Sequence, residues 1–379
     1  MKLLAALLPL VFAQQCLYGQ GDRLIPHNSK NESLRYEVKH AIDKGLKWLE
    51  EKQNPAGYWD GSPTTPLTYT AQALTTLERS PTGDYKSRES VRMGYAYILR
   101  HVQRDGGIYP DKFRDDTGYA TSICIRALLA ADDRKFDPTL HNARRFLVGP
   151  FVAAEKGDKP FNFSSVGLEE KAQVFEALRA TENLHGDPRS AGGTPDPDLN
   201  WEAAIKFVQP YQNLPGFNKA DWVSDRPSDN GGFVMFPGLV KGSGLPADGP
   251  SSLASFREES YKGLLCYIYL GLKRDDPRME AVIGWIQRNY SLGDNPVGVG
   301  SKYSYYHSIA KALATYGMDK VKLPDGTEAD WKNDLAKKLI NLQHDEGHWG
   351  GDATSGYDKD PMRATIQAVL ALEYIYQAQ

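Results

Sequence analysis

Cysteine is scarce in this chain, with only three among 379 residues. Two of them, Cys124 and Cys266, lie in apolar stretches with helical spacing. So few cysteines do not define a disulfide framework, which excludes a small scaffold held together by disulfides. We expect both residues to be buried thiols of the core.

An excess of one charge is also missing. Lysine and arginine total 45 and aspartate and glutamate total 48, and neither sign forms a long block. Proteins that bind phosphate backbones carry a basic patch or stripe. We therefore expect no nucleic-acid partner. With 41% hydrophobic and 25% charged residues, the composition is that of a globular protein.

Long apolar runs are absent too, since no stretch approaches the roughly 18 uninterrupted apolar residues of a transmembrane segment. A shorter apolar run from Leu3 to Ala13 follows Met1 and Lys2. Val11 and Ala13 occupy the minus-three and minus-one positions of a signal-peptidase site. The sequence predicts a signal peptide and short leader over residues 1–20, and a secreted or periplasmic mature protein.

The chain does contain one motif that returns about six times. Its clearest copy is an amphipathic helix from Lys44 that ends at Gln53, followed by a turn with Gly57 and Trp59 and then by a second, more apolar helix. The third copy lacks the Gln of the motif. The second helices are expected at residues 68–78, 117–131, 168–179, 260–272, 305–316 and 363–374, and a first helix of the fourth copy at 201–212.

The second helices are apolar on nearly every side, whereas the first helices carry a charged face. A helix that is apolar all round must be buried. We therefore predict an all-α fold, an (α/α)6 toroid in which the second helices form an inner ring. An open solenoid of the same pairs is the alternative. One domain over residues 21–379 is expected, with long loops at 183–200 and 214–255.

The Gln and Trp of the motif have a structural explanation. Glutamine can bond the backbone groups left unpaired at helix ends, and tryptophan can stack on the neighbouring pair. We predict that these residues join the pairs together and take no part in chemistry.

Lys44, Trp48, Gln53, Gly57 and Trp59 together resemble the QW repeat of squalene–hopene cyclases, which the β subunits of protein prenyltransferases share in weaker form. The resemblance covers residues 35–379. The chain is most similar to secreted bacterial proteins labelled prenyltransferase/squalene oxidase repeat proteins. This resemblance implies a toroid whose chemistry takes place at the N-terminal ends of the inner helices, but it implies no particular reaction.

Cyclases of this class protonate an alkene with an Asp in an Asp-x-Asp-Asp-Thr sequence. The matching residues here are Asp115, Asp116 and Thr117, with Phe113 in place of the first Asp. The resemblance therefore implies acid catalysis by Asp115 and Asp116. The alternative is that Asp116 or Thr117 caps the helix that begins there.

Protein prenyltransferases bind zinc through Asp, Cys and His, with the His in a Tyr-His-Thr sequence. Tyr306, His307 and Ser308 resemble that sequence. Glu259 and Ser260 stand where the Asp and Cys would be expected, so the thiolate is missing and serine is a poor ligand. We expect no zinc at this position and no cofactor.

The remaining candidates should line one mouth, toward which six helix N-termini point their positive ends and favour an anionic or strongly hydrogen-bonding ligand. His307 and Glu259 join Asp115 and Asp116 as candidate acid or base residues. The alternative for the tyrosines is packing at the rim of the mouth. The alternative for Arg363 is a solvated charge at the start of a helix. The candidate ligand-binding residues are Tyr69, Tyr119, Glu169, Tyr261, Tyr305, Tyr306 and Arg363.

Three functions remain open. The first is a protein that binds an isoprenoid-type ligand, or acts on it as a cyclase, by acid/base chemistry in a central cavity, as the resemblance implies. The second is a secreted carbohydrate-active enzyme or sugar-binding protein that uses the same cavity, because aromatic platforms with Asp/Glu pairs suit sugar rings. The third is a non-catalytic interaction scaffold. The oligomeric state does not follow from the sequence.

Overall fold

The computed structural model describes residues 32–61, 66–83, 85–111, 116–155, 167–182, 184, 199–237, 254–293, 301–351 and 356–379. The predicted signal peptide, Asp115, most of the 183–200 loop and residues 238–253 of the 214–255 loop lie outside these residues.

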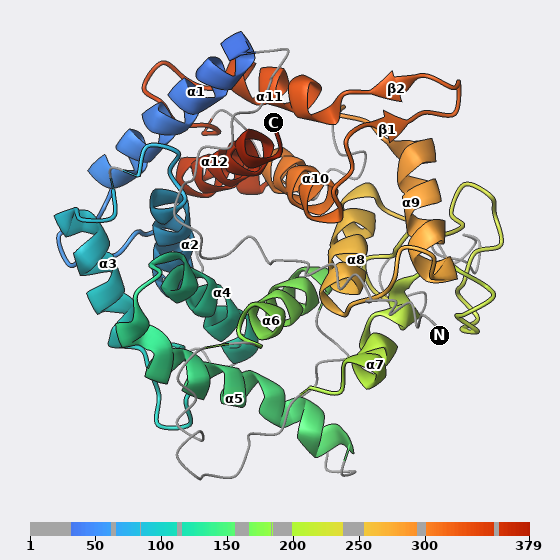
Figure 1. Cartoon of the computed structure of the whole chain (residues 1–379), viewed down its shortest axis with the longest axis horizontal. Helices are drawn as coiled ribbons and strands as arrows, with labels where there is room; N and C mark the ends of the chain where they lie inside the picture. The colour runs from blue at the N-terminus through green and yellow to red at the C-terminus, as the bar shows by residue number, and fades with distance from the viewer. Residues whose placement is uncertain are drawn as a thin grey trace, which may run out of the picture.

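Six helices form an inner ring in chain order (Figure 1). Each packs against the next, and the last packs against the first. The ring is therefore closed, and the prediction of an (α/α)6 toroid is confirmed. The inner helices are α2 (Pro66–Glu78), α4 (Thr117–Ala130), α6 (Leu168–Ala180), α8 (Arg257–Tyr269), α10 (Lys302–Tyr316) and α12 (Pro361–Ala378).

The outer ring consists of α1 (Glu32–Glu51), α3 (Glu89–Leu99), α5 (Asp137–Glu155), α9 (Pro277–Asn289) and α11 (Trp331–Asn341), with the short α7 (Trp201–Ala204) in the fourth position. The prediction of a continuous helix over 201–212 was wrong. After α7 the chain continues as the 3₁₀ turns Ile205–Phe207 and Gln209–Tyr211. Pro210 cannot donate the backbone hydrogen bond that an α-helix needs there.

A small hairpin lies between α10 and α11. Strands β1 (Val321–Lys322) and β2 (Glu328–Ala329) pair antiparallel, with Val321 opposite Ala329. The sequence analysis did not predict this hairpin. Short 3₁₀ turns at Arg134–Phe136 and Tyr357–Lys359 precede α5 and α12.

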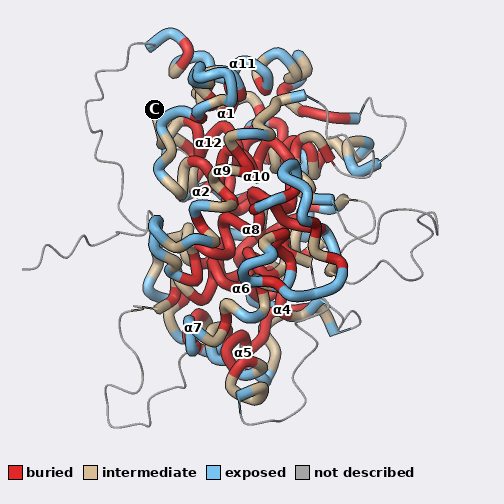
Figure 2. Tube along the Cα trace, turned by 90° about the vertical axis from the view of Figure 1, so that its right-hand side faces the viewer, coloured by how far each residue is buried: buried red, intermediate tan, exposed pale blue. Residues whose placement is uncertain are grey.

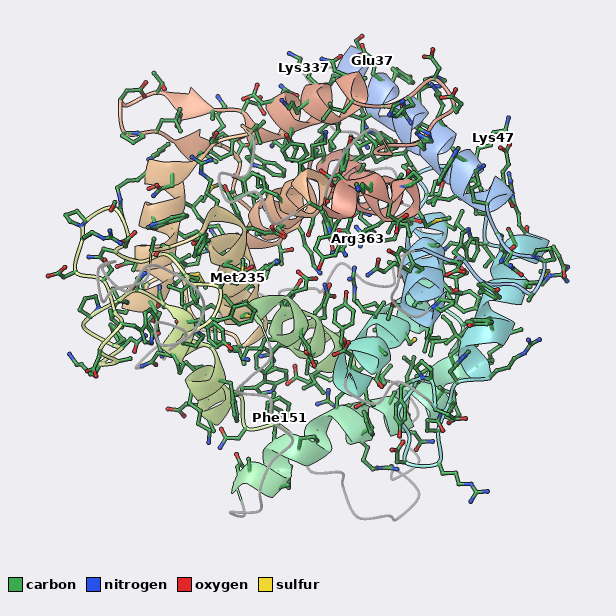
Figure 3. All side chains as sticks on the ribbon, turned by 180° about the vertical axis from the view of Figure 1, so that it is seen from behind. Glu37, Lys47, Phe151, Met235, Lys337 and Arg363 are labelled. Carbon is green, nitrogen blue, oxygen red and sulfur yellow. The ribbon has the colours of Figure 1, made fainter. Side chains whose placement is uncertain are left out.

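Burial separates the two rings. Buried residues concentrate in the middle of the molecule, on the inner helices (Figure 2). Glu37, Lys47 and Lys337 of the outer helices project away from the ring (Figure 3). Cys124 and Cys266 are buried and free, as predicted. Among the described residues no helix combines the length and apolar character that crossing a membrane requires.

The predicted role of Gln in joining the pairs is confirmed, whereas the hydrogen bond of Trp59 lies within its own pair. The Gln53 side chain donates to the carbonyls of Gly57, at 3.1 Å, and of Ser90 in the next outer helix, at 2.7 Å. The Trp59 indole N–H donates to the Leu49 carbonyl at 2.6 Å. The Gln53 bonds tie the turn to the next outer helix, and the Trp59 bond ties it to its own.

The same contacts close the ring between the sixth pair and the first. Gln343 donates to the Gly347 carbonyl at 2.8 Å and to the Ala41 carbonyl of α1 at 2.9 Å. Gly347 has a φ of +101°, and a Cβ there would lie 2.6 Å from the Lys44 carbonyl oxygen. Because first and last pairs meet as consecutive pairs do, the open solenoid is excluded.

Candidate functional site

The N-terminal ends of the inner helices meet at one end of the ring. The Tyr69 hydroxyl of α2 donates to Asp360, directly before α12, at 2.6 Å. Ser304 of α10 donates to Glu258 of α8 at 2.8 Å. Lys262 of α8 lies 3.5 Å from Glu169 of α6. This arrangement follows from the repeat, because every turn leads from an outer helix into the start of an inner one.

Lys262 is the centre of a cluster of carboxylates. Its ammonium nitrogen lies 3.0 Å from Glu258, 3.2 Å from Glu259 and 3.5 Å from Glu169. Glu258, Glu259 and Lys262 belong to the first two turns of α8 and are nearly buried, whereas the Glu169 side chain keeps 42% of its surface exposed. One cation therefore holds three acids from two helices together, and one of those acids remains open to solvent.

The environment moves the pKa values of two of these acids in opposite directions. Burial raises the pKa of Glu259, and Glu258 raises it further, against the opposing effect of Lys262. Burial also raises the pKa of Glu169, but Lys262, the Gln173 amide and Lys311 lower it by more, so the pKa lies below its usual value. The pKa values of these two neighbouring acids are therefore moved apart.

His307 of α10 is 7% exposed and its Nδ1 lies 2.6 Å from the amide oxygen of Gln367. Because that oxygen can only accept, Nδ1 carries the proton and Nε2 is a bare acceptor. Nε2 has no hydrogen-bond partner among the described residues. Burial lowers the pKa of His307, and the positive charges of Lys311 and Arg126 lower it further. The imidazole is therefore neutral.

A second group of charges lies deeper along the same helices. Glu176 of α6 binds Lys311 of α10 at 2.5 Å and Arg126 of α4 at 3.4 Å. Arg126 also donates to the Gln173 amide oxygen at 2.9 Å. We call Arg126, Glu176 and Lys311 the buried ion cluster. All three are at most 3% exposed, so they join three inner helices out of contact with solvent.

Tyr119 and Arg363 complete the N-terminal end. Burial and the Glu169 carboxylate raise the pKa of Tyr119, and the positive charge of Arg363 opposes this increase. The Gln72 amide lies 3.4 Å from the Tyr119 hydroxyl. Arg363 stands at the inner edge of the ring (Figure 3) and over the Tyr357 ring at 4.2 Å. We call the following residues the axis site: Tyr119, Glu169, Gln173, Glu258, Glu259, Lys262, His307 and Arg363.

The structure therefore brings together five of the residues singled out from the sequence: Tyr119, Glu169, Glu259, His307 and Arg363. Other candidates stand apart from them. The Tyr305 hydroxyl donates to the Ser291 carbonyl at 2.7 Å and Tyr306 to the Leu292 carbonyl at 3.2 Å. The Tyr261 ring is buried against Tyr305, with centroids 6.1 Å apart. The Tyr305 and Tyr306 hydroxyls therefore fix the segment after α9.

Asp116 occupies the N-cap position of α4, exposed, and its side chain makes no capping hydrogen bond. It acts instead on Glu170 of α6. Burial raises the pKa of Glu170 to about 7, with a further contribution from the Asp116 charge. Asp115 lies outside the described residues.

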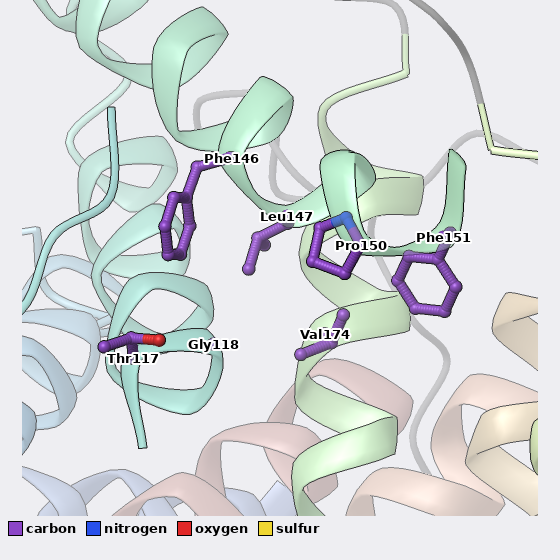
Figure 4. A pocket seen from close by; sticks show the side chains of 7 residues that line it. All are labelled: Thr117, Gly118, Phe146, Leu147, Pro150, Phe151 and Val174. Carbon is purple, nitrogen blue, oxygen red and sulfur yellow. The ribbon is translucent and has the colours of Figure 1, made fainter. Parts of the chain in front are cut away.

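A small apolar pocket lies between α4, α5 and α6 (Figure 4). It is lined by Thr117, Gly118, Phe146, Leu147, Pro150, Phe151 and Val174. No charged residue is among them, in contrast to the axis site.

Sequence reasoning missed Lys262, Glu170 and the buried ion cluster. The available signal was charge in the middle of an inner helix: Arg126, Glu176 and Lys311 each have apolar residues on both sides in the sequence. Charged residues are rarely fully buried unless they are paired. Within the described residues, the one group with the spacing of metal ligands lies on the outer ring, at His344, Glu346 and His348.

Comparisons with known proteins support the fold. A type II terpene cyclase from Scytonema, MstE, covers 92% of this chain and 99% of its own, with 13% identity and a TM-score of 0.54. A GH76 α-1,6-mannanase from Salegentibacter covers 90% and 100%, with 11% identity and a TM-score of 0.56. No protein-family model matches the sequence, and no curated protein sequence matches it.

These two solved proteins have different substrates. Structures of MstE include one with geranylgeranyl dihydroxybenzoate as substrate. A mannanase variant with two consecutive aspartates replaced by asparagine is described as inactive and was solved with α-1,6-mannotriose. At this level of identity the likeness shows a shared helical toroid fold, and the chemistry must be argued from the axis site itself.

Proposed function

We propose that the axis site binds a hydroxyl-rich ligand of the carbohydrate class. The observation that carries this proposal is the polar character of the site, where charged, amide and imidazole groups from four inner helices face one another. A carbohydrate offers donors and acceptors to each of them.

An isoprenoid chain would fit this site poorly. It offers no hydrogen bonds, so binding over the half-exposed Glu169 carboxylate would remove that charge from water without compensation. An uncompensated polar group costs about 1–3 kcal/mol, and a charged group costs more. A sugar hydroxyl can instead donate its proton to the Glu169 carboxylate.

The two acids can also supply glycosidase chemistry. Glu259, whose raised pKa favours the protonated form, would give its proton to the glycosidic oxygen. Glu169, whose lowered pKa keeps it ionised, would take a proton from water or attack the sugar carbon. This division of labour between two carboxyl groups is that of glycoside hydrolases.

The mannanase likeness adds weight to this class of ligand, since a protein of similar fold was solved in complex with α-1,6-mannotriose. The MstE likeness and the Asp115-Asp116-Thr117 sequence favour the isoprenoid reading as the second candidate. The two readings require different residues: the first depends on Glu169 and Glu259, and the second on Asp115 and Asp116.

The test is ligand binding by the purified chain from residue 21 onward. A panel of defined oligosaccharides, including α-1,6-mannotriose, and of geranylgeranyl compounds is screened by thermal shift, and hits are measured by calorimetry. We expect an oligosaccharide to bind, and Glu169→Gln to weaken binding roughly 10–100-fold, because a hydrogen bond to a charged group is lost.

Glu328→Gln is the matched control, since Glu328 is an exposed acid of the hairpin paired with Lys320 at 3.7 Å. It should leave binding unchanged. Binding of geranylgeranyl compounds that depends on Asp116, with no response to sugars, would overturn the carbohydrate proposal and establish the second candidate.

We further propose that the chain belongs to the group of secreted repeat proteins with the QW motif and is exported after removal of its first 20 or so residues. The Leu3–Ala13 run and the Gln53, Gly57 and Trp59 spacing support this. N-terminal sequencing of the mature protein from a cell fraction outside the cytoplasm tests it.

A further inference from the structure

The turn after α11 brings three metal-ligand side chains together. Its backbone is fixed by two hydrogen bonds, from the His344 N–H to the His348 carbonyl and from the Gly347 N–H to the His344 carbonyl, both at 2.9 Å. Gln343 adds a bond from its side chain to the Gly347 carbonyl at 2.8 Å. The three side chains therefore project from a rigid backbone.

The ligand atoms of His344, Glu346 and His348 all lie within 4.8 Å of one another. The two imidazole rings have centroids 4.4 Å apart and are inclined at 72°. Three ligands at about 2.1 Å from one Zn²⁺ are separated by roughly 3.5 Å. Small side-chain rotations would therefore bring all three atoms onto one ion.

The first turn of the chain shows that the fold does not require these residues. There the Asn54 N–H donates to the Tyr58 carbonyl and the Gly57 N–H to the Asn54 carbonyl, both at 2.8 Å. The turn is the same, but Asn54, Ala56 and Tyr58 take the places of the two histidines and the glutamate.

The equivalence extends to the neighbouring outer helix. Tyr58 packs on Tyr97 of α3 with centroids 5.1 Å apart, and His348 packs on Trp48 of α1 at 5.3 Å. An aromatic contact at this position therefore works with tyrosine as well as with histidine. Turn geometry and packing do not account for the two histidines and the glutamate in the sixth turn.

We propose that His344, Glu346 and His348 form a binding site for a divalent transition-metal ion of the Zn²⁺ class. Two imidazoles and one carboxylate are a ligand set that zinc accepts, and imidazole disfavours the hard cations Ca²⁺ and Mg²⁺. Glu346 is exposed, so water completes the coordination. The ion would stand where the sixth helix pair meets the first. This site is independent of the axis site.

The test uses the purified chain from residue 21 onward without an affinity tag, stripped with a chelator and titrated with Zn²⁺ in competition with a chromophoric chelator. We expect one equivalent to bind. His344→Asn and His348→Tyr install the residues of the first turn, so folding is preserved, and each should weaken binding at least about tenfold because one of three protein ligands is lost. Circular dichroism verifies that both variants are folded.

Cobalt provides a second measurement. Co²⁺ at the site should give the visible absorption of a four-coordinate ion, and the double variant His344→Asn/His348→Tyr should abolish it. His40→Asn, which removes an exposed histidine of α1, is the control and should change neither measurement. Absence of saturable Zn²⁺ binding, or binding unchanged in the double variant, would overturn the proposal.

Discussion

The contacts between helix pairs and the residues around the ring axis follow opposite rules. Between pairs, the same contacts return: Gln53 and Gln343 each bridge their own turn and the next outer helix. Around the axis the contacts that the structure describes differ from one helix to the next. The inner helices present Arg126, Glu176, Lys262, His307 and other residues, each from a different helix or at a different depth.

This difference separates structure from chemistry. A contact that recurs in several pairs meets a need that all pairs share, namely to satisfy helix ends and to hold neighbours together. A residue that occurs once meets no such need, and burying its charge has a cost that the repeat would avoid with an apolar side chain. The axis is therefore where function is to be sought.

The largest effect is expected at the buried ion cluster. Glu176→Gln leaves Lys311 and Arg126 facing a neutral amide, and breaking a buried ion pair costs about 3–5 kcal/mol of the free energy of unfolding. Urea denaturation of the variant and of Glu328→Gln, an exposed control, measures this. A loss below about 1 kcal/mol would show that the axis charges contribute no more to stability than surface charges do.

A smaller effect is expected between the pairs, at Gly347. Gly347→Ala imposes an unfavourable backbone conformation, at about 1–2 kcal/mol, and pushes a Cβ against the Lys44 carbonyl, for which overpacking adds about 1–3 kcal/mol.

Gly326→Ala is the matched control for that variant. Gly326 also has a positive φ, +85°, but a Cβ there meets nothing within 4 Å. It should show the conformational cost alone. Equal losses of unfolding free energy in the two variants would contradict the close approach of the sixth turn to α1.

The smallest effect is a pH dependence at Glu170. Its pKa is raised to about 7 in the folded protein, by burial and by Asp116. In the unfolded chain the pKa of this carboxyl is about 4.3, so it releases its proton at a lower pH than in the folded protein. The native state then holds more protons, so this contribution to stability falls as pH rises from about 4.3 to about 7 and is constant above.

Unfolding free energies measured between roughly pH 5 and pH 8 test this. Glu170 is partly solvated, so we expect a slope of at most about 1 kcal/mol per pH unit. Glu170→Gln should reduce that slope, and the part that remains belongs to Glu259 and Glu373, whose pKa values are also raised. Glu169→Gln should retain it, because the pKa of Glu169 is lowered and its contribution is lost only in acid. A slope that Glu170→Gln leaves unchanged would assign the titration to other groups.

The ring could be predicted from the sequence because its signals are local and repeated. Apolar periodicity, Gln at helix ends and Gly in the turns recur often enough that a weak copy of the repeat is recognised from the clear ones. Where the repeat weakens, prediction failed: 201–212 is a short helix followed by 3₁₀ turns. The hairpin Val321–Ala329 was missed because two-residue strands carry almost no periodic signal.

The axis site could be predicted only in part. Position at the start of an inner helix selected Tyr119, Glu169, Glu259, His307 and Arg363, which do come together. The same criterion selected Tyr305 and Tyr306, whose hydroxyls instead bond backbone carbonyls after α9. Consecutive residues of a helix point about 100° apart, and which of them faces the axis depends on how the helix is rotated against its neighbours.

By itself, then, the sequence determined the number of helix pairs, their order and their buried faces, because these depend on spacing along the chain. Only the tertiary structure decided that Lys262 holds acids from two helices, that Glu176 joins Arg126 and Lys311, and that His344 and His348 face each other. Such groupings are set by distances between side chains, and packing brings residues far apart in the chain within reach of one another.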